Sequence, residues 1–151
     1  MTTSQDNVSD KHELDLLTTA FFSAVSFKEG EKPDYQNLYQ IFIESGQFFK
    51  NISGSPEIST VSQFIEPRQK LVAAGELTSF RETETAEITE IFGNIAHRFS
   101  TYEKSGRSAG SEIVGRGIIS IQFVMTGIGW RISSMAWDDE RAGLTIPDRY
   151  K

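Results

Sequence analysis

His97 lies among apolar residues in a stretch of chain that reads as extended, residues 78–103. Ile95, His97 and Phe99 occupy alternate positions, so their side chains are expected on one face of a strand. An imidazole on an apolar face is well suited to act as a general base near neutral pH. The alternative, a histidine bonded to a backbone carbonyl or placed in a dimer interface, is the commoner outcome for such a residue.

Acidic residues on the same stretch are the second source of chemistry. Glu82 and Glu84 share the parity of Phe80 and Ala86, whereas Glu87 has the opposite parity. A carboxyl group that is desolvated in an apolar pocket has a raised pKa and can serve as an acid or a base. Several acids on one strand more often form a solvated edge, and this alternative stays open.

The remaining candidates for contact with a ligand are tyrosines and the residues at the end of the last predicted strand. Tyr35, Tyr39 and Tyr102 could each donate a hydrogen bond to a ligand oxygen, although buried tyrosines usually find a backbone partner. Trp137 and the acids at 138–140 end a strand, where the mouth of a barrel would lie. The alternative for these acids is a cap on the turn into the C-terminal tail.

Composition excludes several classes of function. The chain has 151 residues, a net charge of −6 and scattered basic residues, which argues against nucleic acid or an acidic membrane surface as partner. It has no cysteine and two histidines, so neither a metal site nor a cofactor is expected. The first ten residues lack the pattern of a signal peptide, and the longest apolar stretch is too short to span a bilayer. We therefore expect a cytoplasmic location.

Helical patterns dominate the first half of the chain. Residues 1–9 are expected to be disordered, and a helix is expected over 11–28, with a capping box at Asp10 and Glu13. A second, shorter helix capped by Asp34 should carry Leu38, Ile41 and Phe42 inward, followed by a strand at 45–52. Another capping box, Thr60 with Gln63, starts a third helix, which is either kinked or divided at Pro67.

Extended patterns dominate the second half. The parity of the apolar residues changes near Gly93, which indicates a bulge or a turn within 78–103. A loop is expected at 104–111, then a long hairpin at 112–140, in which Trp130 and Trp137 should face opposite sides of the sheet. Helices followed by consecutive strands indicate one α+β domain over 10–151.

The order of these elements resembles the nuclear transport factor 2-like superfamily, which includes SnoaL-like cyclases, ketosteroid isomerases and scytalone dehydratase. The closing residues GWRISSMAW resemble the last strand of that family. The segment FRETETAEITEIFGNIAHRFSTYE resembles the central strands of the family. The resemblance covers residues 10–150. It implies three N-terminal helices packed on a strongly curved, mainly antiparallel sheet, which forms a cone-shaped half-barrel with a ligand at its mouth. It also implies a homodimer through the open face of the sheet.

This resemblance leads to two hypotheses about function. In the first, an apolar cone pocket binds a small organic molecule, and a cofactor-free isomerase, dehydratase or cyclase acts on it by proton transfer. His97 and Glu82 would then be the acid and base, and Tyr39 or Tyr102 the donor to an oxyanion. In the second, the protein is a non-catalytic dimeric binding or interaction module whose cone is filled by its own phenylalanines. The residues expected to contact a ligand are Phe21, Tyr39, Phe42, Tyr102 and Trp137.

Overall fold

The computed structural model describes residues 4–151 and the side chains from residue 8 onward. Its helices and strands follow the expected order, with one additional short strand. The helices are α1 Ser4–Val25, η1 Tyr35–Asn37, α2 Leu38–Ile41, α3 Val61–Ala73 and η2 Asp148–Tyr150. The strands are β1 Phe42–Lys50, β2 Glu57–Thr60, β3 Leu77–Phe92, β4 Ile95–Ser108, β5 Ser111–Thr126 and β6 Gly129–Asp139.

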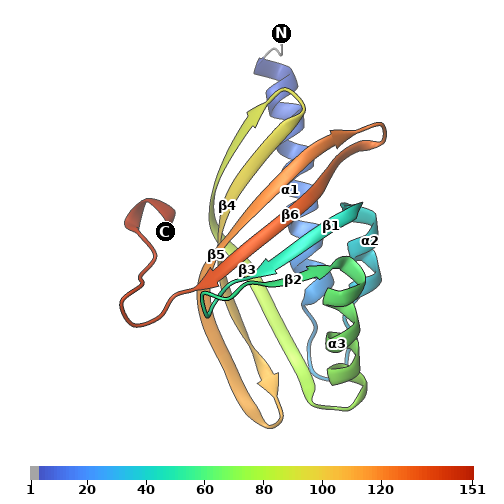
Figure 1. Cartoon of the computed structure of the whole chain (residues 1–151), viewed down its shortest axis with the longest axis vertical. Coiled ribbons are helices and arrows are strands. Elements are labelled where there is room, and N and C mark those ends of the chain that lie inside the picture. Colours follow the sequence, from blue (N-terminus) through green and yellow to red (C-terminus); the bar gives the residue numbers. More distant parts are fainter. Residues whose placement is uncertain (1–3) are drawn as a thin grey trace.

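The strands form a single six-stranded sheet in the order β2-β1-β6-β5-β4-β3. Neighbouring strands are antiparallel except β1 and β6, which are parallel. Figure 1 shows the long strands bending along their length, with α1 on one side of the sheet and α3 beside β1, β2 and β3. The predicted α+β class, with helices on a curved and mainly antiparallel sheet, is confirmed.

The first helix starts earlier than its capping pattern predicted. It begins at Ser4, so it includes part of the stretch expected to be disordered; residues 1–3 lie outside the described part. Asp10 is therefore inside the helix and not at its cap, and its carboxylate accepts a hydrogen bond of 3.0 Å from the indole of Trp130. The predicted apolar face is confirmed, since Leu14, Phe21 and Val25 are buried.

The second and third helices differ in how well they were predicted. The second is only a 3₁₀ turn and one α turn, Asp34 makes no capping hydrogen bond, and Phe42 already belongs to β1. In contrast, Thr60 and Gln63 form the predicted capping box, with bonds of 3.0 and 3.2 Å. Pro67 does not divide α3, which runs as one helix through it.

The long strands correct the predicted loop at 104–111. The change of parity near Gly93 is a tight turn between β3 and β4, in which this glycine has a φ of 57°. β4 continues to Ser108, and only two residues separate it from β5. The small polar residues of this stretch form a strand because β3 and β5 pair with it from both sides, which outweighs weak β propensity. The β5–β6 hairpin is confirmed.

Two bulges reverse the predicted side-chain directions. Thr85 is the extra residue in β3 and Ser133 the extra residue in β6. Beyond Thr85 the parity changes, so Glu87 points to the same face as Glu84 and not to the opposite one. Beyond Ser133 the same happens to the two tryptophans, which both lie on the core side: Trp130 is 1% exposed, and Trp137 packs edge-on against two phenylalanines.

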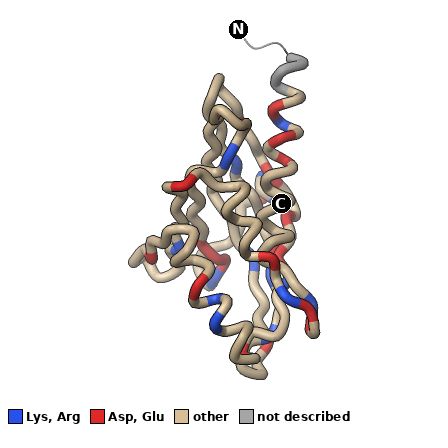
Figure 2. Tube along the Cα trace, turned by 90° about the vertical axis from the view of Figure 1, so that its right-hand side faces the viewer, with Lys and Arg blue, Asp and Glu red and all other residues tan. Residues whose placement is uncertain are grey.

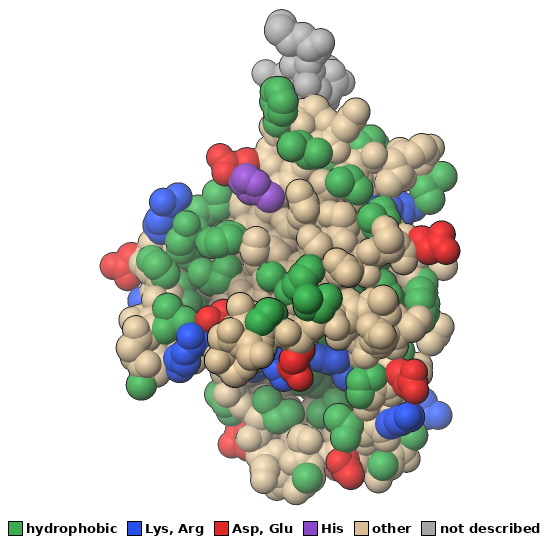
Figure 3. All heavy atoms as spheres, viewed as in Figure 1, with side chains coloured by type: hydrophobic (Ala, Val, Ile, Leu, Met, Phe, Trp, Pro, Cys, Tyr) green, Lys and Arg blue, Asp and Glu red, His purple; other side chains and the backbone are tan. Residues whose placement is uncertain are grey.

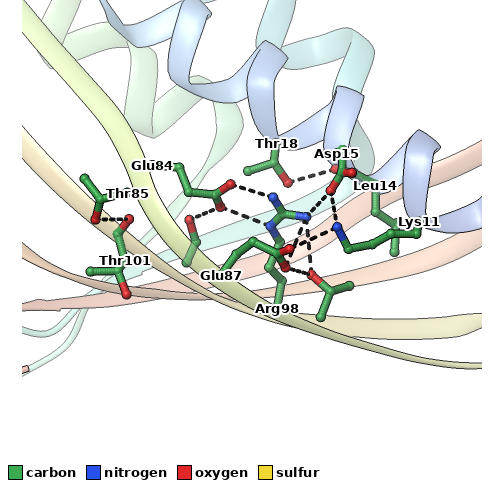
Figure 4. A network of polar contacts seen from close by, with 11 residues as sticks. Lys11, Leu14, Asp15, Thr18, Glu84, Thr85, Glu87, Arg98 and Thr101 are labelled. Atoms are coloured by element: carbon green, nitrogen blue, oxygen red, sulfur yellow. Dashed lines mark hydrogen bonds and ion pairs between the residues drawn. The ribbon is translucent and has the colours of Figure 1, made fainter. Parts of the chain in front are cut away.

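A buried arginine joins α1 to the sheet (Figure 4). The side chain of Arg98 on β4 is 4% exposed and lies 2.6 Å from Glu84 and 2.6 Å from Asp15. Lys11 lies between Asp15 and Glu87, at 2.7 and 3.0 Å. Burial alone would raise the pKa of Asp15, yet the hydrogen bonds from Arg98 and Lys11 hold it below its usual value. We call these five side chains the Arg98 cluster.

Elsewhere, charges of both signs are interspersed along the chain (Figure 2).

Candidate functional site

A cavity of about 470 Å³ lies between α3, the end of α1 and the concave face of the sheet. Its volume falls within the range of sites for small molecules. Its wall is aromatic on several sides, and the rings of Phe48 and Phe64 stack with centres 4.1 Å apart. The cavity thus lies beside phenylalanines that pack on one another. The aromatic residues of the wall are Phe21, Tyr35, Phe48, Phe64, Phe80, Tyr102 and Trp137.

Glu82 brings a carboxyl group into this cavity. Its position is fixed through the backbone, because its N–H donates to the hydroxyl of Ser26 at 3.0 Å. Phe27 and Phe80 exchange two backbone hydrogen bonds beside it, so the end of α1 is tied to β3. The carboxyl group itself has no hydrogen-bond or ion-pair partner among the side chains that the structure describes. It is therefore free to meet a ligand.

Burial raises the pKa of Glu82 to about 7. Lys104, its cross-strand neighbour on β4, acts in the opposite direction, and Asp139 adds to the rise. A carboxyl group with this pKa is present in both protonation states near neutral pH, which is the condition for efficient proton transfer.

Asp139 engages both Tyr102 and Lys104. The hydroxyl of Tyr102 donates to the carboxylate of Asp139, and the ammonium of Lys104 lies 2.8 Å from the same group. Burial and Asp139 raise the pKa of Tyr102. Because the single hydroxyl hydrogen of Tyr102 is already used, this residue contributes its ring to the wall of the cavity, while Lys104 keeps further N–H donors.

Gly117 on β5 allows Tyr102 to take this position. A Cβ atom at Gly117 would collide with the Tyr102 hydroxyl and with the backbone carbonyl of Asp138. We expect Gly117→Ala to destabilise the protein by about 1–3 kcal/mol, the usual cost of overpacking, and to displace Tyr102. Urea denaturation and the fluorescence of Trp137 report the two effects. Gly127→Ala is the matched control, because that position has open space around it, and its stability should stay within about 0.5 kcal/mol of the parent. Equal stabilities of the two variants would contradict this role of Gly117.

Arg68 adds a positive charge to the α3 side of the cavity. Its guanidinium lies over the ring of Phe64, with Cζ 3.6 Å from the ring centre, and donates to the backbone carbonyl of the same residue at 2.9 Å. Burial lowers its pKa, which remains far above the physiological range because a guanidinium keeps its proton there.

The structure brings only some of the predicted site residues together. Phe21, Glu82, Tyr102 and Trp137 line the cavity. His97 lies on the outer face of the sheet, where its side chain is 64% exposed and its Nε2 lies 2.8 Å from Glu90.

Two other residues expected to contact a ligand also lie outside the cavity. Tyr39 is 46% exposed and bonds Ser62 at 2.9 Å. Phe42 is buried in the core against Phe48.

Arg68 and Lys104 were missed from the sequence for different reasons. Lys104 falls in the stretch for which the sequence predicts a loop. Arg68 follows Pro67, a residue that predicts a kink or a break in the helix. Its spacing of four residues from Phe64 is the signal that places both on one helix face. Among the described residues there is no group of acids and histidines suited to a metal ion, and no helix long and apolar enough to cross a membrane.

Comparison with solved structures identifies the fold. A nuclear transport factor 2-like superfamily protein from Salmonella enterica superposes with a TM-score of 0.72 at 16% identity, over 88% of this chain and 92% of that one. An NTF2-like protein with a cystatin-like fold from Novosphingobium aromaticivorans gives 0.66 at 14%, over 95% and 96%. A protein of unknown function from Mycobacterium tuberculosis gives 0.73 at 14%, over 98% and 83%.

The chain therefore has the nuclear transport factor 2-like fold, as its resemblance implied. No family model and no curated protein matches the sequence. Identities of this size carry the fold alone, so the function has to be argued from the cavity.

Proposed function

We propose that the cavity binds a small organic molecule and that Glu82 transfers a proton to or from it without a cofactor. The observation that carries this proposal is a carboxyl group inside an aromatic-walled cavity that makes no hydrogen bond or ion pair with the described side chains. Isomerisation, dehydration and cyclisation next to a carbonyl all need such a group. Of the two residues expected to act as acid and base, only Glu82 reaches the cavity.

The surroundings of Glu82 suit this role. Lys104 lies across from it on the same face of the sheet and could stabilise negative charge that develops on a carbonyl oxygen. Trp137 and Phe80 are only partly buried and offer apolar surface for the body of the ligand. The expected donors Tyr39 and Tyr102 do not fit, because the first is outside the cavity and the hydroxyl hydrogen of the second is taken.

A neutral aromatic probe tests the proton transfer. Nitrobenzisoxazole loses a ring proton to a base, its N–O bond breaks, and a coloured nitrophenolate forms. The protein should accelerate this reaction with a rate that rises with pH through about 7, as Glu82 ionises. Glu82→Gln should lower the rate by about 100-fold, the usual contribution of a positioned base.

His97→Gln is the control for this experiment. Its imidazole lies on the outer face of the sheet, so the rate should not change. A rate that depends on His97 and not on Glu82 would remove Glu82 from the mechanism.

Exposed apolar residues on the outer face of the sheet support the expected homodimer. Phe92, Ile95 and Phe99 are 83%, 52% and 40% exposed there, and apolar clusters of this kind are typical of interaction sites. Figure 3 shows hydrophobic side chains spread over the face turned toward the viewer. Solution scattering should give the mass of two chains, and the mass of one chain would refute the dimer.

This dimer would also serve the alternative function, a non-catalytic binding or interaction module. The cytoplasmic location and the absence of nucleic-acid and membrane partners stay predictions that rest on charge and composition.

A further inference from the structure

Arg68 is a cation of the cavity that the protein leaves without a carboxylate. Among the side chains that the structure describes, no carboxylate oxygen lies within 4.0 Å of its guanidinium. One of its nitrogens donates to the backbone carbonyl of Phe64, and the phenyl ring of that residue supports the plane of the guanidinium. The remaining N–H groups are held in place and are available to a ligand.

Besides Arg68 and Glu82, the charged residues that line the cavity are Lys50, Glu57 and Lys104. Lys104 is paired with Asp139 at 2.8 Å. At the edge of the cavity, Lys50 lies directly across from Glu57 in the β1–β2 pairing. Arg68 and Glu82 remain, and the ionised form of Glu82 acts on Arg68 electrostatically, so the cavity has room for one negative charge on its ligand when Glu82 is protonated.

Glu82 makes this preference depend on pH. When protonated, its carboxyl group is neutral and can donate a hydrogen bond to an anionic ligand. When ionised, it repels that ligand in a cavity where burial strengthens electrostatic interactions. An anion should therefore bind best below the pH at which Glu82 ionises.

We propose that the ligand is a planar aromatic monocarboxylate whose carboxylate binds Arg68 and whose ring packs against Trp137 and Phe80, the two partly buried aromatic residues of the cavity wall. The planar fork of a guanidinium matches the two oxygens of a carboxylate. A single negative charge matches the one uncompensated positive charge, whereas a phosphate carries more. This inference names the ligand class of the cavity and rests on the proposed function.

Three ligands with the same naphthalene ring provide the test: naphthoate, its neutral amide, which has nearly the same shape, and naphthyl phosphate. In titration calorimetry at pH 6, naphthoate should bind the wild-type protein about 10- to 100-fold more tightly than the amide, as expected for a charged hydrogen bond in a cavity. It should also bind more tightly than the phosphate, and its advantage over the amide should shrink at pH 8. Arg68→Met should abolish that advantage.

Arg149→Met is the matched control, because Arg149 also stacks on an aromatic ring, that of Tyr150, but lies outside the cavity. It should leave the binding of naphthoate unchanged. Equal binding of naphthoate and the amide by the wild type would overturn the proposal, and so would a preference that survives in Arg68→Met. If Arg68→Met does not fold, the comparison of naphthoate with its amide on the wild-type protein still tests the proposal.

The two proposals fail in different ways. Turnover of nitrobenzisoxazole that depends on Glu82, together with equal binding of naphthoate and amide, would overturn the anion preference alone. Tighter binding of the phosphate would overturn the choice of a carboxylate. If none of the three ligands binds, the ligand class is wrong; the proposed function is wrong as well if turnover of nitrobenzisoxazole does not depend on Glu82.

Discussion

Arg98→Met should lower the free energy of unfolding at pH 7 by about 3–5 kcal/mol, the usual loss when one partner of a buried ion pair is removed. The side chain of Arg98 is 4% exposed, and Glu84, Asp15 and Glu87 lie within 3.7 Å of it. Methionine fills similar space but leaves these carboxylates without their main cation. Urea denaturation followed by circular dichroism measures the loss.

Arg116→Met is the control for the Arg98 cluster. Arg116 pairs with Glu140 at 3.0 Å, yet its side chain is 54% exposed. Exposed pairs contribute about 0–1 kcal/mol, so this variant should stay within that range. If Arg98→Met lowered the free energy of unfolding no more than Arg116→Met does, the Arg98 cluster would not stabilise the packing of α1 on the sheet.

The difference in unfolding free energy between the wild type and Arg98→Met should become smaller at acidic pH. In the wild type the pKa values of Asp15 and Glu87 lie below their usual values, so the stability they provide is present above the unfolded pKa and is lost as pH falls through the folded one. Without Arg98, these carboxylates can accept protons and lose their repulsion. The two proteins should therefore approach each other in stability as pH falls below the usual carboxyl pKa, and a constant difference would contradict the electrostatic explanation.

Glu82→Gln should make the protein more stable at pH 8 and leave it nearly unchanged at pH 5. The pKa of Glu82 is raised from 4.5 to about 7 on folding, so the folded state holds a proton that the unfolded state has lost in this interval. Stability therefore falls as pH rises through the interval, by at most about 3 kcal/mol for a shift of this size. The cavity admits some water to the carboxyl group, which keeps the effect below that limit.

Urea denaturation of both proteins at pH 5 and pH 8 tests this effect. Glutamine has nearly the same shape and cannot ionise, so it removes the pH dependence of this position alone. Asp15 and Glu87, whose pKa values are lowered, act with the opposite sign and at lower pH, and their effects cancel in the comparison. An unchanged pH dependence in Glu82→Gln would mean that Glu82 is not desolvated.

The sequence predicted those elements whose pattern is local. The apolar face of α1, the capping box of α3 and the β5–β6 hairpin are all set by residues close together in the chain, and the structure confirms them. Glu82 was also placed correctly on the face of Phe80, because no irregularity of β3 separates the two.

What the sequence could not predict depends on pairing between distant residues. The bulges at Thr85 and Ser133 carry no turn signal, yet each reverses every side chain beyond it. Lys104 lies in a segment that becomes a strand only because β3 and β5 pair with it. The outward position of His97 follows from the packing of α1 on the other face of the sheet, which alternation alone does not specify.

The state of the Glu82 carboxyl group tests the account most directly. Its carbon resonance can be followed by NMR as a function of pH and assigned by its absence in Glu82→Gln. We expect a midpoint of about 7, which moves upward when naphthoate is bound. A midpoint near 4.5, the value for a solvated glutamate, would contradict a buried acid–base group in this cavity.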